Sequence, residues 1–222
     1  MPVTDTWLIN LVTPLNQKEV AAVFGRQLPF LGINPYEEVM LNNSYPSHAT
    51  PDGISPAGRT AFSNANCAVK RKYVLEAPFD IKVAAGEEWS LVKNILTRSQ
   101  KISYAPTAMV YHSHSIERLY LKAYIYAYGL CQTTDGPYYS NIGYSMAHFF
   151  FWLMKDFIFF IKKRYFSDLY KLTFHEILRH YYLWKGSVDF KEGKPTKFNS
   201  TMFKLFSSII GIKGKQPQTP LH

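Results

Sequence analysis

The first half of the chain alternates segments with strand-like and helix-like patterns. Apolar side chains recur at roughly helical spacing in residues 7–15, and residues 19–28 then contain a short β-type run that ends at Gly25. Residues 36–45 favour a short helix, and residues 87–98 favour an amphipathic one. Strands that alternate with helices predict an α/β core. Further strands are expected at residues 61–69, 102–104 and 108–111, the last two separated by Pro106.

The second half has a different pattern, with long helices rich in tyrosine and phenylalanine from residue 115 onward. This change places a boundary near residue 130. Residues 198–212 are a second candidate amphipathic helix beyond it. We therefore expect an α/β domain in residues 1–130, a helical, membrane-surface-associated region in 131–213 and a disordered tail in 214–222.

Residues 145–166 contain the run FFFWLMKDFIFFIKKRYF, which is long enough to span a bilayer. Lys155 and Asp156 lie in its middle, and each charge would cost about 2.5 to 3.5 kcal/mol at the centre of a membrane helix. His148, Lys155 and Lys162 recur every seven residues and form a narrow polar stripe on a helix. A helix in the membrane interface therefore fits better than a spanning one. A buried helix with a basic end is the alternative.

The charge of the chain indicates the kind of partner that it binds, and its cysteine content indicates the cellular compartment. The 25 Lys and Arg outnumber 16 Asp and Glu, and the net charge of +9 points to an anionic partner. Lys162, Lys163 and Arg164 would meet the headgroups of an anionic membrane surface. Nucleic acid is not an expected partner, because the aromatic residues cluster with aliphatic ones. With only Cys67 and Cys131 and no signal peptide, we expect a cytoplasmic protein at the inner face of the plasma membrane.

Glu87 and Glu88 are the first candidate catalytic residues, since they stand where the helix of residues 87–98 begins. The dipole of a helix stabilises carboxylates at this end, and a carboxylate there is suited to accept a proton from an acceptor hydroxyl. Plain complementarity to the helix dipole is the alternative, and for an isolated Glu pair it is the commoner explanation.

Other candidate residues occur in pairs two positions apart. His112 and His114 follow the last expected strand, so both rings would face one side of the sheet and present imidazole to a metal ion. Two histidines alone do not complete a metal site. Asn64 and Asn66 would point together from a strand and hydrogen-bond sugar hydroxyls, with loop stabilisation as the alternative. Arg26 ends a strand and would either contact phosphate or be solvated.

The segments VFGRQLP, FSNANCAVKR, PFD, GEEW and YAPTAMVYHSHS, in this order, resemble bacterial family 2 glycosyltransferases, especially the rhamnosyltransferase-like branch. The resemblance covers about residues 4–130, and the later tyrosine-rich helices look like that branch's tail. It implies an α/β fold of the GT-A type followed by an aromatic-rich helical tail. It also implies inverting transfer of a hexose or rhamnose from a nucleotide sugar to a lipid-linked or polysaccharide acceptor in cell-surface polysaccharide synthesis.

The resemblance assigns roles to particular residues. The family's Glu-Asp pair falls on residues 87–88, so that Glu88 would be the general base. An alignment anchored on Trp89 would instead move the pair to residues 85–86 and remove the base. In the first register, Trp89 is similar to aromatic residues that stack on sugar rings. His112 resembles the histidine that completes the shell of a divalent metal, Mg or Mn, while the pocket that lines the sugar and acceptor would include Asn64 and Asn66.

In this family an acidic D-x-D triplet binds the metal and the donor diphosphate, and it stands just ahead of a segment like PVTDTWLINLVTPL. No D-x-D triplet occurs in the 222 residues. We therefore expect a partial GT-A sandwich that lacks its N-terminal nucleotide-binding strands and has an incomplete metal site. A separate N-terminal half would be its partner. The alternative is a catalytically inactive module for binding or assembly at the membrane surface.

Overall fold

The computed structural model describes residues 1–30, 35–50, 62–79, 83, 86–113, 116–133, 138–194, 201–202 and 204–205. These residues form a mixed α/β protein with a three-stranded sheet and seven α-helices. The chain divides into two compact units, which we call unit 1 and unit 2. Unit 1 contains Met1–Ile33, Met40–Ile81 and Glu87–Ser113, and unit 2 contains Asn34–Val39, Lys82–Gly86 and His114–His222.

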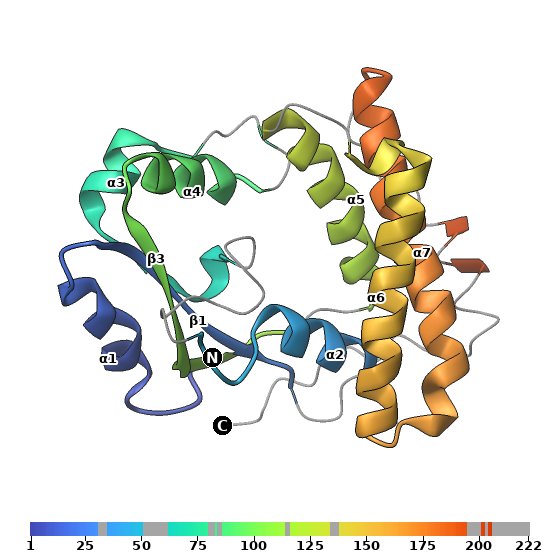
Figure 1. The fold of residues 1–222 in the computed structure, drawn as a ribbon, viewed down its shortest axis with the longest axis horizontal. Coiled ribbons are helices and arrows are strands. Elements are labelled where there is room, and N and C mark those ends of the chain that lie inside the picture. The colour runs from blue at the N-terminus through green and yellow to red at the C-terminus, as the bar shows by residue number, and fades with distance from the viewer. Residues whose placement is uncertain are drawn as a thin grey trace. The chain divides into compact units, whose positions relative to one another are not determined.

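Unit 1 is built on the sheet, whose strand order is β2-β1-β3 (Figure 1). The central strand β1 (Val20–Leu28) pairs antiparallel with β2 (Cys67–Val69) and parallel with β3 (Lys101–Tyr111). The residues from Val20 to Phe24 are all buried, as expected for a continuous apolar run in a strand covered on both faces. The strand continues beyond the predicted end at Gly25 to Leu28.

The two short strands expected on either side of Pro106 are a single strand, β3, and the prediction of a break was wrong. The strand instead bulges. Gly25 of β1 pairs with Ala105 and the next residue, Arg26, pairs with Met109, so residues 106–108 intervene on β3. Because proline has no N–H to give to the neighbouring strand, a bulge accommodates it where a regular ladder would not.

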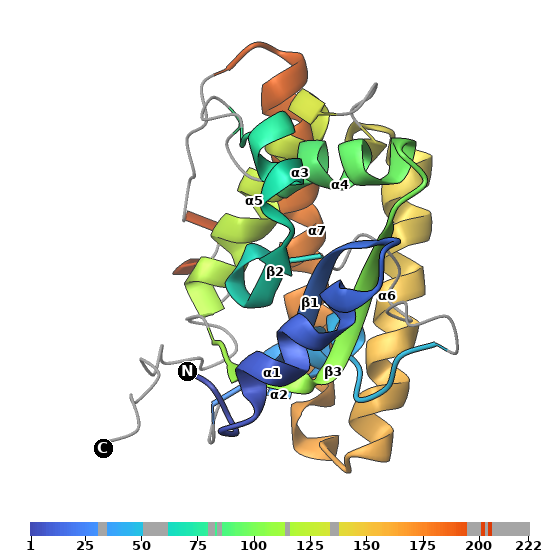
Figure 2. The ribbon, with the colours of Figure 1, turned by 90° about the vertical axis from the view of Figure 1, so that its left-hand side faces the viewer.

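Helices cover both faces of this sheet. On one face, Leu91 and Ile95 of α4 (Glu88–Thr97) pack with Phe24, and Tyr73 of α3 (Arg71–Glu76) joins the same core. On the other face, Leu11 packs with Val23 and with the bulged part of β3. Leu11 belongs to α1 (Trp7–Val12), which lies beside β1 and β3 (Figure 2). The predicted helices at residues 7–15 and 87–98 are therefore confirmed.

Unit 2 is helical, as the change of pattern after residue 115 predicts. Its long helices are α5 (Ile116–Thr133), α6 (Ile142–Lys162) and α7 (Leu169–Lys191), and α7 packs along both of the others (Figure 1). The boundary expected near residue 130 falls inside α5, and the two units divide between residues 113 and 114. The tail expected in residues 214–222, and most of the helix expected in 198–212, lie outside the described residues.

The helix expected in residues 36–45 is confirmed as α2 (Pro35–Ser44), which contributes residues to both units. Tyr36 and Val39, near its beginning, are buried and belong to unit 2. Asn42 and the following Tyr45 belong to unit 1, where they contribute to the site described below. α2 therefore contributes side chains to the polar clusters of both units, which are described below.

Gly186 sets how closely α5 and α7 approach, and its replacement tests their packing. A Cβ at this position would lie 2.3 Å from the backbone oxygen of Tyr124, a contact that only a shift of the backbone can relieve. We expect Gly186→Ala to lower the free energy of unfolding by about 1 to 3 kcal/mol in urea titrations.

Gly143→Ala in α6 is the matched control for this substitution. The nearest atom to a Cβ at Gly143, Oδ1 of Asn141, lies 3.4 Å away, and alanine favours a helix over glycine. The free energy of unfolding should stay equal or rise by up to about 1 kcal/mol. Equal stability of the Gly186→Ala variant and the wild type would contradict the close contact between α5 and α7.

Candidate functional site

Three of the segments that carry the family resemblance meet around the side chain of Tyr45, which follows α2. Burial raises the pKa of Tyr45, a hydrogen bond with Ser63 lowers it, and the negative charge of Glu88 raises it again. Gln27, buried near the end of β1, also hydrogen-bonds Tyr45 and lowers its pKa. Ser63 comes from FSNANC, Glu88 from GEEW and Gln27 from VFGRQLP. We call Tyr45, Gln27, Ser63, Glu88 and Cys67 the Tyr45 cluster.

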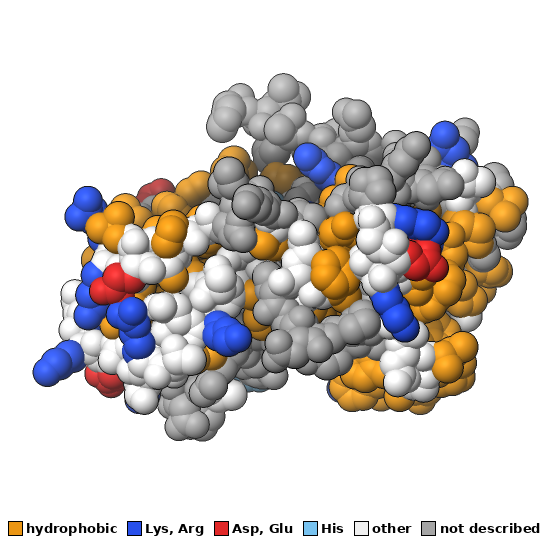
Figure 3. Space-filling view, turned by 90° about the horizontal axis from the view of Figure 1, so that it is seen from above, with side chains coloured by type: hydrophobic (Ala, Val, Ile, Leu, Met, Phe, Trp, Pro, Cys, Tyr) orange, Lys and Arg blue, Asp and Glu red, His pale blue; other side chains and the backbone are white. Residues whose placement is uncertain are grey.

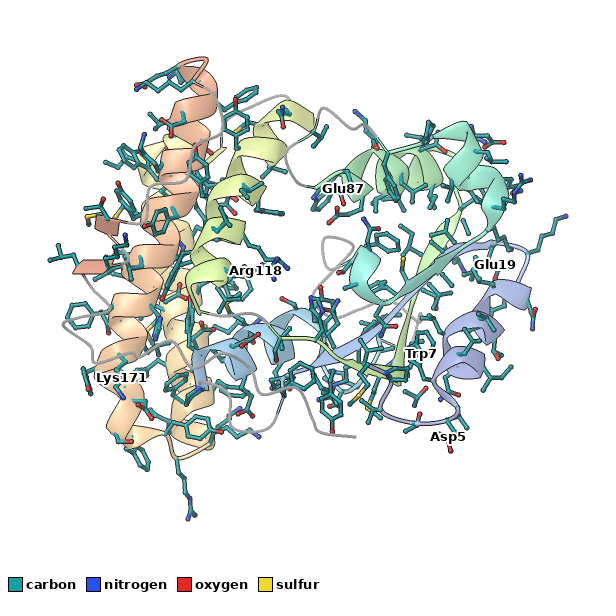
Figure 4. The ribbon with its side chains drawn as sticks, turned by 180° about the vertical axis from the view of Figure 1, so that it is seen from behind. Asp5, Trp7, Glu19, Glu87, Arg118 and Lys171 are labelled. Carbon is teal, nitrogen blue, oxygen red and sulfur yellow. The ribbon has the colours of Figure 1, made fainter. Side chains whose placement is uncertain are left out.

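Glu87 and Glu88 open a helix, as predicted. Glu87 is the N-cap residue of α4 (Figure 4) and Glu88 is its first residue, so both carboxylates lie at the positive end of the helix dipole. Oε1 of Glu87 accepts a hydrogen bond of 3.0 Å from the amide of Asn64. Glu88 instead lies near Cys67, because its charge, after the larger effect of burial, helps to raise the pKa of that thiol to about 11. Cys67 is therefore protonated at neutral pH.

Arg26 supplies a positive charge near the same end of the sheet. It lies within β1, two residues before the strand ends, and not at its last position as predicted. One terminal nitrogen donates to Oδ1 of Asn42 at 3.4 Å. Burial raises the pKa of Tyr104, and the nearby Arg26 guanidinium lowers it. Nε of Arg26 is buried and has no hydrogen-bond partner among the residues that the structure describes, so this side chain has an unused donor.

Asn64 and Asn66 do not share a strand face, and the prediction that they point together was wrong. They lie in a 3-10 helix, Asn64–Asn66, in which Asn64 is exposed and Asn66 is buried. Of the described residues from 62 to 69, only Cys67–Val69 form a strand. A tight turn changes the direction of successive side chains, which a period of two residues cannot represent.

Asn66 uses its side chain to join three parts of unit 1. Its amide nitrogen donates to the backbone oxygens of Ala108 at 2.8 Å and Arg26 at 3.1 Å. Its oxygen accepts from the indole N–H of Trp7 at 2.9 Å. Trp7 lies on α1 (Figure 4), so one buried amide connects α1, β1 and the bulge of β3. These groups hold the protein together and leave Asn66 little capacity to bind a sugar.

Of the remaining predicted site residues, the structure describes Trp89 and His112 but not His114. Trp89 is the second residue of α4 and is partly buried. His112 follows β3 directly, and its backbone N–H donates to the oxygen of Leu28 at 2.9 Å, which fixes it at the end of the parallel pair. His114 lies outside the described residues. Within the described part of the chain, no group of three or more His, Cys, Asp or Glu side chains is arranged to hold a metal.

Sequence reasoning missed the central position of Tyr45 and the role of Trp7. Neither belongs to a motif with a chemical signature. Tyr45 reaches the cluster because the end of α2 lies near β1, where Asn42 accepts a hydrogen bond from Arg26. Trp7 reaches Asn66 across 59 positions of sequence. The signals that pointed to this region were the segments VFGRQLP, FSNANCAVKR and GEEW, which carry the family resemblance.

Unit 2 contains a second concentration of polar groups, buried between its helices, which we call the Glu176 cluster: Tyr36, Glu176, Arg179, His180 and His148. Glu176 is fully buried, and Oε1 accepts a hydrogen bond of 2.5 Å from the hydroxyl of Tyr36. The Arg179 guanidinium lies 3.4 Å from Oε2. A buried carboxylate that lost these partners would be strongly destabilising, so the cluster fixes how α2 packs on α7.

A chain of hydrogen bonds within this cluster fixes the tautomers of two histidines. The indole of Trp152, which can only donate, contacts Nε2 of His148 at 2.9 Å. Nδ1 of His148 therefore carries the proton and donates to Nε2 of His180, also at 2.9 Å. Nδ1 of His180 then donates to the backbone oxygen of Glu176 at 2.9 Å. Burial, and after it the charge of Arg179, lowers the pKa of both histidines to about 4 and keeps them neutral.

The hydrogen bonds of Asn66 predict a large difference between two neighbouring asparagines. Asn66→Ala leaves two backbone oxygens and the Trp7 indole without their partner, and we expect the free energy of unfolding to fall by about 2 to 4 kcal/mol. Asn64→Ala removes one exposed hydrogen bond to Glu87 and should change the free energy of unfolding by less than about 1 kcal/mol. Urea unfolding of the two variants measures the difference, and equal effects would contradict the assignment of Asn66 as a structural residue.

The buried histidines predict a loss of stability below pH 6.5. Burial, with a smaller effect of Lys171, lowers the pKa of His175 in the folded protein to about 3. Above about pH 6.5 the histidine is neutral in both the folded and the unfolded protein. Between about pH 6.5 and the folded pKa, only the unfolded chain binds the proton. His175 should therefore lower the free energy of unfolding by about 1.4 kcal/mol per pH unit in this window.

Urea unfolding at several pH values between 7 and 4 tests this effect by comparing slopes. The His175→Phe variant should lose stability less steeply than the wild type as the pH falls. His48→Gln, at an exposed position, is the control for the loss of one histidine, and its pH slope should equal that of the wild type. Identical pH slopes of His175→Phe and the wild type would show that His175 is not held neutral by burial.

In comparisons with known proteins, no protein-family model and no curated protein matches this chain. Its function is therefore inferred from the residues and contacts of the two units.

Proposed function

We propose that this chain carries the acceptor side of a family 2 glycosyltransferase of the GT-A type, with Glu88 as the general base. The observation that carries the proposal is the Tyr45 cluster. Its members come from three separate segments that resemble the family's motifs, and they surround one side chain in unit 1. Residues of three motifs that lie around one side chain would be able to contact a single acceptor.

The position of Glu88 suits proton transfer from a hydroxyl group. The start of α4 stabilises the ionised form of the carboxylate through the helix dipole. In the proposed reaction the oxygen of the acceptor hydroxyl attacks the anomeric carbon of the donor sugar, and its proton passes to Glu88. The bond between that carbon and the nucleoside diphosphate breaks, and the diphosphate leaves with the electron pair. A positioned base of this kind contributes about a hundredfold to ten-thousandfold to a rate.

Arg26 is the residue best suited to meet the donor diphosphate. Its guanidinium carries a permanent positive charge, and its Nε is a buried donor that no described residue uses. The donor would be a nucleotide sugar, and the acceptor a lipid-linked or polysaccharide hydroxyl. Trp89, next to the proposed base, would stack on a sugar ring. His112 would be one ligand of a divalent metal, Mg or Mn.

The described residues do not by themselves complete such a metal site, because they contain no group of three or more suitable side chains. Further ligands would have to come from an acidic triplet, which this sequence does not contain. No step of the proposed transfer is therefore assigned to a metal. A separate N-terminal half, if one associates with this chain, would supply the nucleotide-binding strands.

A second candidate function has its own support. The outer face of α6 is strongly apolar, with Phe151 and Met154 both more than half exposed. This face favours a module that binds or assembles at a membrane surface without catalysing sugar transfer. The two functions differ in whether Glu88 matters, since a binding module needs no base.

Glu88→Gln distinguishes the two functions. Glutamine keeps the size of the side chain but cannot accept the proton, so transfer should fall by about a hundredfold or more while the donor KM changes little. The measurement is incorporation of labelled sugar from a panel of nucleotide sugars into acceptors extracted from membranes, using membranes of cells that express the gene.

Glu19→Gln is the control, because the exposed side chain of Glu19 forms a long ion pair with Lys101, at 3.9 Å. Its activity should equal that of the wild type. Wild-type activity in the Glu88→Gln variant would overturn the assignment of the base. Absence of transfer in the wild type with every donor, in membranes of its native cells where any separate N-terminal half would be present, would instead support the binding module.

A further inference from the structure

Helix α6 has its polar side chains on the inside and its apolar side chains on the outside. The side chains of Phe150, Phe151, Met154, Phe157, Ile158 and Ile161 are between 40% and 63% exposed. No charged residue is among the exposed positions from Ile142 to Ile161. Hydrophobic side chains gather on the right of the space-filling view, the side on which α6 and α7 stand in Figure 1 (Figure 3). A helix on the surface of a water-soluble domain has the opposite arrangement.

Most of the polar stripe expected from the sequence is turned inward: His148 and Lys155, with Asp156 beside them, are at least partly buried, and only Lys162 at its end is exposed. Asp156 is 1% exposed and contributes to raising the pKa of the neighbouring Arg179. His148 is bonded to Trp152 and to His180. Nζ of Lys155, which is partly buried, lies 4.6 Å from the ring centre of Trp152. The polar groups of α6 are therefore satisfied within unit 2, and the face opposite them is left without polar character.

The chemistry of this outer face fits lipid better than another protein. Protein interfaces carry polar rims and roughly one hydrogen bond for every 100 to 200 Å². Apart from the hydroxyl of Tyr144, the exposed side chains of α6 before Lys162 offer no hydrogen-bonding group. Hydrocarbon chains need none. The apolar face ends directly at Lys162, Lys163 and Arg164, all exposed, which is where anionic headgroups would lie above the hydrocarbon.

We propose that the outer face of α6 inserts into one leaflet of an anionic membrane, with Lys162, Lys163 and Arg164 among the headgroups. α6 is long and apolar enough to cross a bilayer by length and composition. A contact along the surface fits better, because charged residues lie midway along both helices: Lys155 and Asp156 on α6, and Glu176 and Arg179 on α7, which packs against it. Charged side chains at that depth are costly in a membrane-spanning segment. This membrane contact does not depend on sugar transfer.

Vesicle flotation tests the apolar part of the proposal. Met154→Gln, Ile158→Gln and Ile161→Gln, combined in one variant, place three polar groups on the outer face. We expect its partition onto vesicles of phosphatidylcholine and phosphatidylglycerol to fall at least about tenfold. The matched control combines Leu8→Gln, Ile9→Gln and Leu75→Gln, three comparably exposed apolar residues of unit 1, and should bind like the wild type. Circular dichroism verifies that both variants remain folded.

The basic residues predict a dependence on lipid charge and salt. Lys162→Gln combined with Arg164→Asn should weaken binding to vesicles with phosphatidylglycerol by about fivefold per residue and remove most of its salt dependence. Asparagine suits position 164, where φ is 62°. Binding to pure phosphatidylcholine should not change. If these substitutions weakened binding to both kinds of vesicle equally, the proposed headgroup contact would be wrong.

Fluorescence quenching shows which face enters the lipid. Phe157 on α6 and Phe79 in unit 1 are both 40% exposed, so Phe157→Trp and Phe79→Trp form a matched pair. Only the Phe157→Trp signal should be quenched by brominated phosphatidylcholine, beyond the quenching of the native tryptophans. Equal quenching of both would overturn the proposal. So would a wild-type dimer in sedimentation that the triple glutamine variant dissociates without any loss of vesicle binding, because the face would then join two copies.

Discussion

The side chain of Asn66 is the contact on which the architecture of unit 1 depends most directly. It bonds the backbone of β1 at Arg26, the bulge of β3 at Ala108 and the indole of Trp7. Gly25 makes room for this arrangement, since a Cβ there would lie 2.2 Å from the oxygen of Ala108 and 2.4 Å from the Asn66 amide. A buried amide with every group paired holds one geometry, because any other leaves a polar group unsatisfied.

The candidate chemistry of unit 1 depends on this frame. Ser63 and Cys67 flank the short 3-10 helix that contains Asn66, so the amide that fixes the helix also positions them beside Tyr45 and Glu88. The proposed base thus stands on a helix start that faces a rigid part of the sheet. A base held by well-packed secondary structure keeps its position relative to a substrate, which proton transfer requires.

In unit 2 the buried polar groups are also paired with one another, but there the result is an apolar outer surface. Glu176, Arg179 and the paired histidines are withdrawn from water and bonded to one another. Because these polar groups occupy the interior of the helical unit, the apolar residues of α6 are left on its outside. One arrangement therefore explains both the neutral buried histidines and the outer surface for which we propose a lipid environment.

The local pattern of the sequence by itself determined much of the secondary structure. The apolar run of β1, the amphipathic spacing of α4, and the Glu pair at its start depend on neighbours a few residues away, so they could be predicted. Tertiary structure alone decided the rest. Three features depend on partners far along the chain: the joining of β3 through a bulge at Pro106, the opposite exposures of Asn64 and Asn66, and the inward direction of His148 and Asp156 on α6. Periodicity shows that a helix has two faces, but only the pairing of buried polar groups decided which face of α6 lies inside.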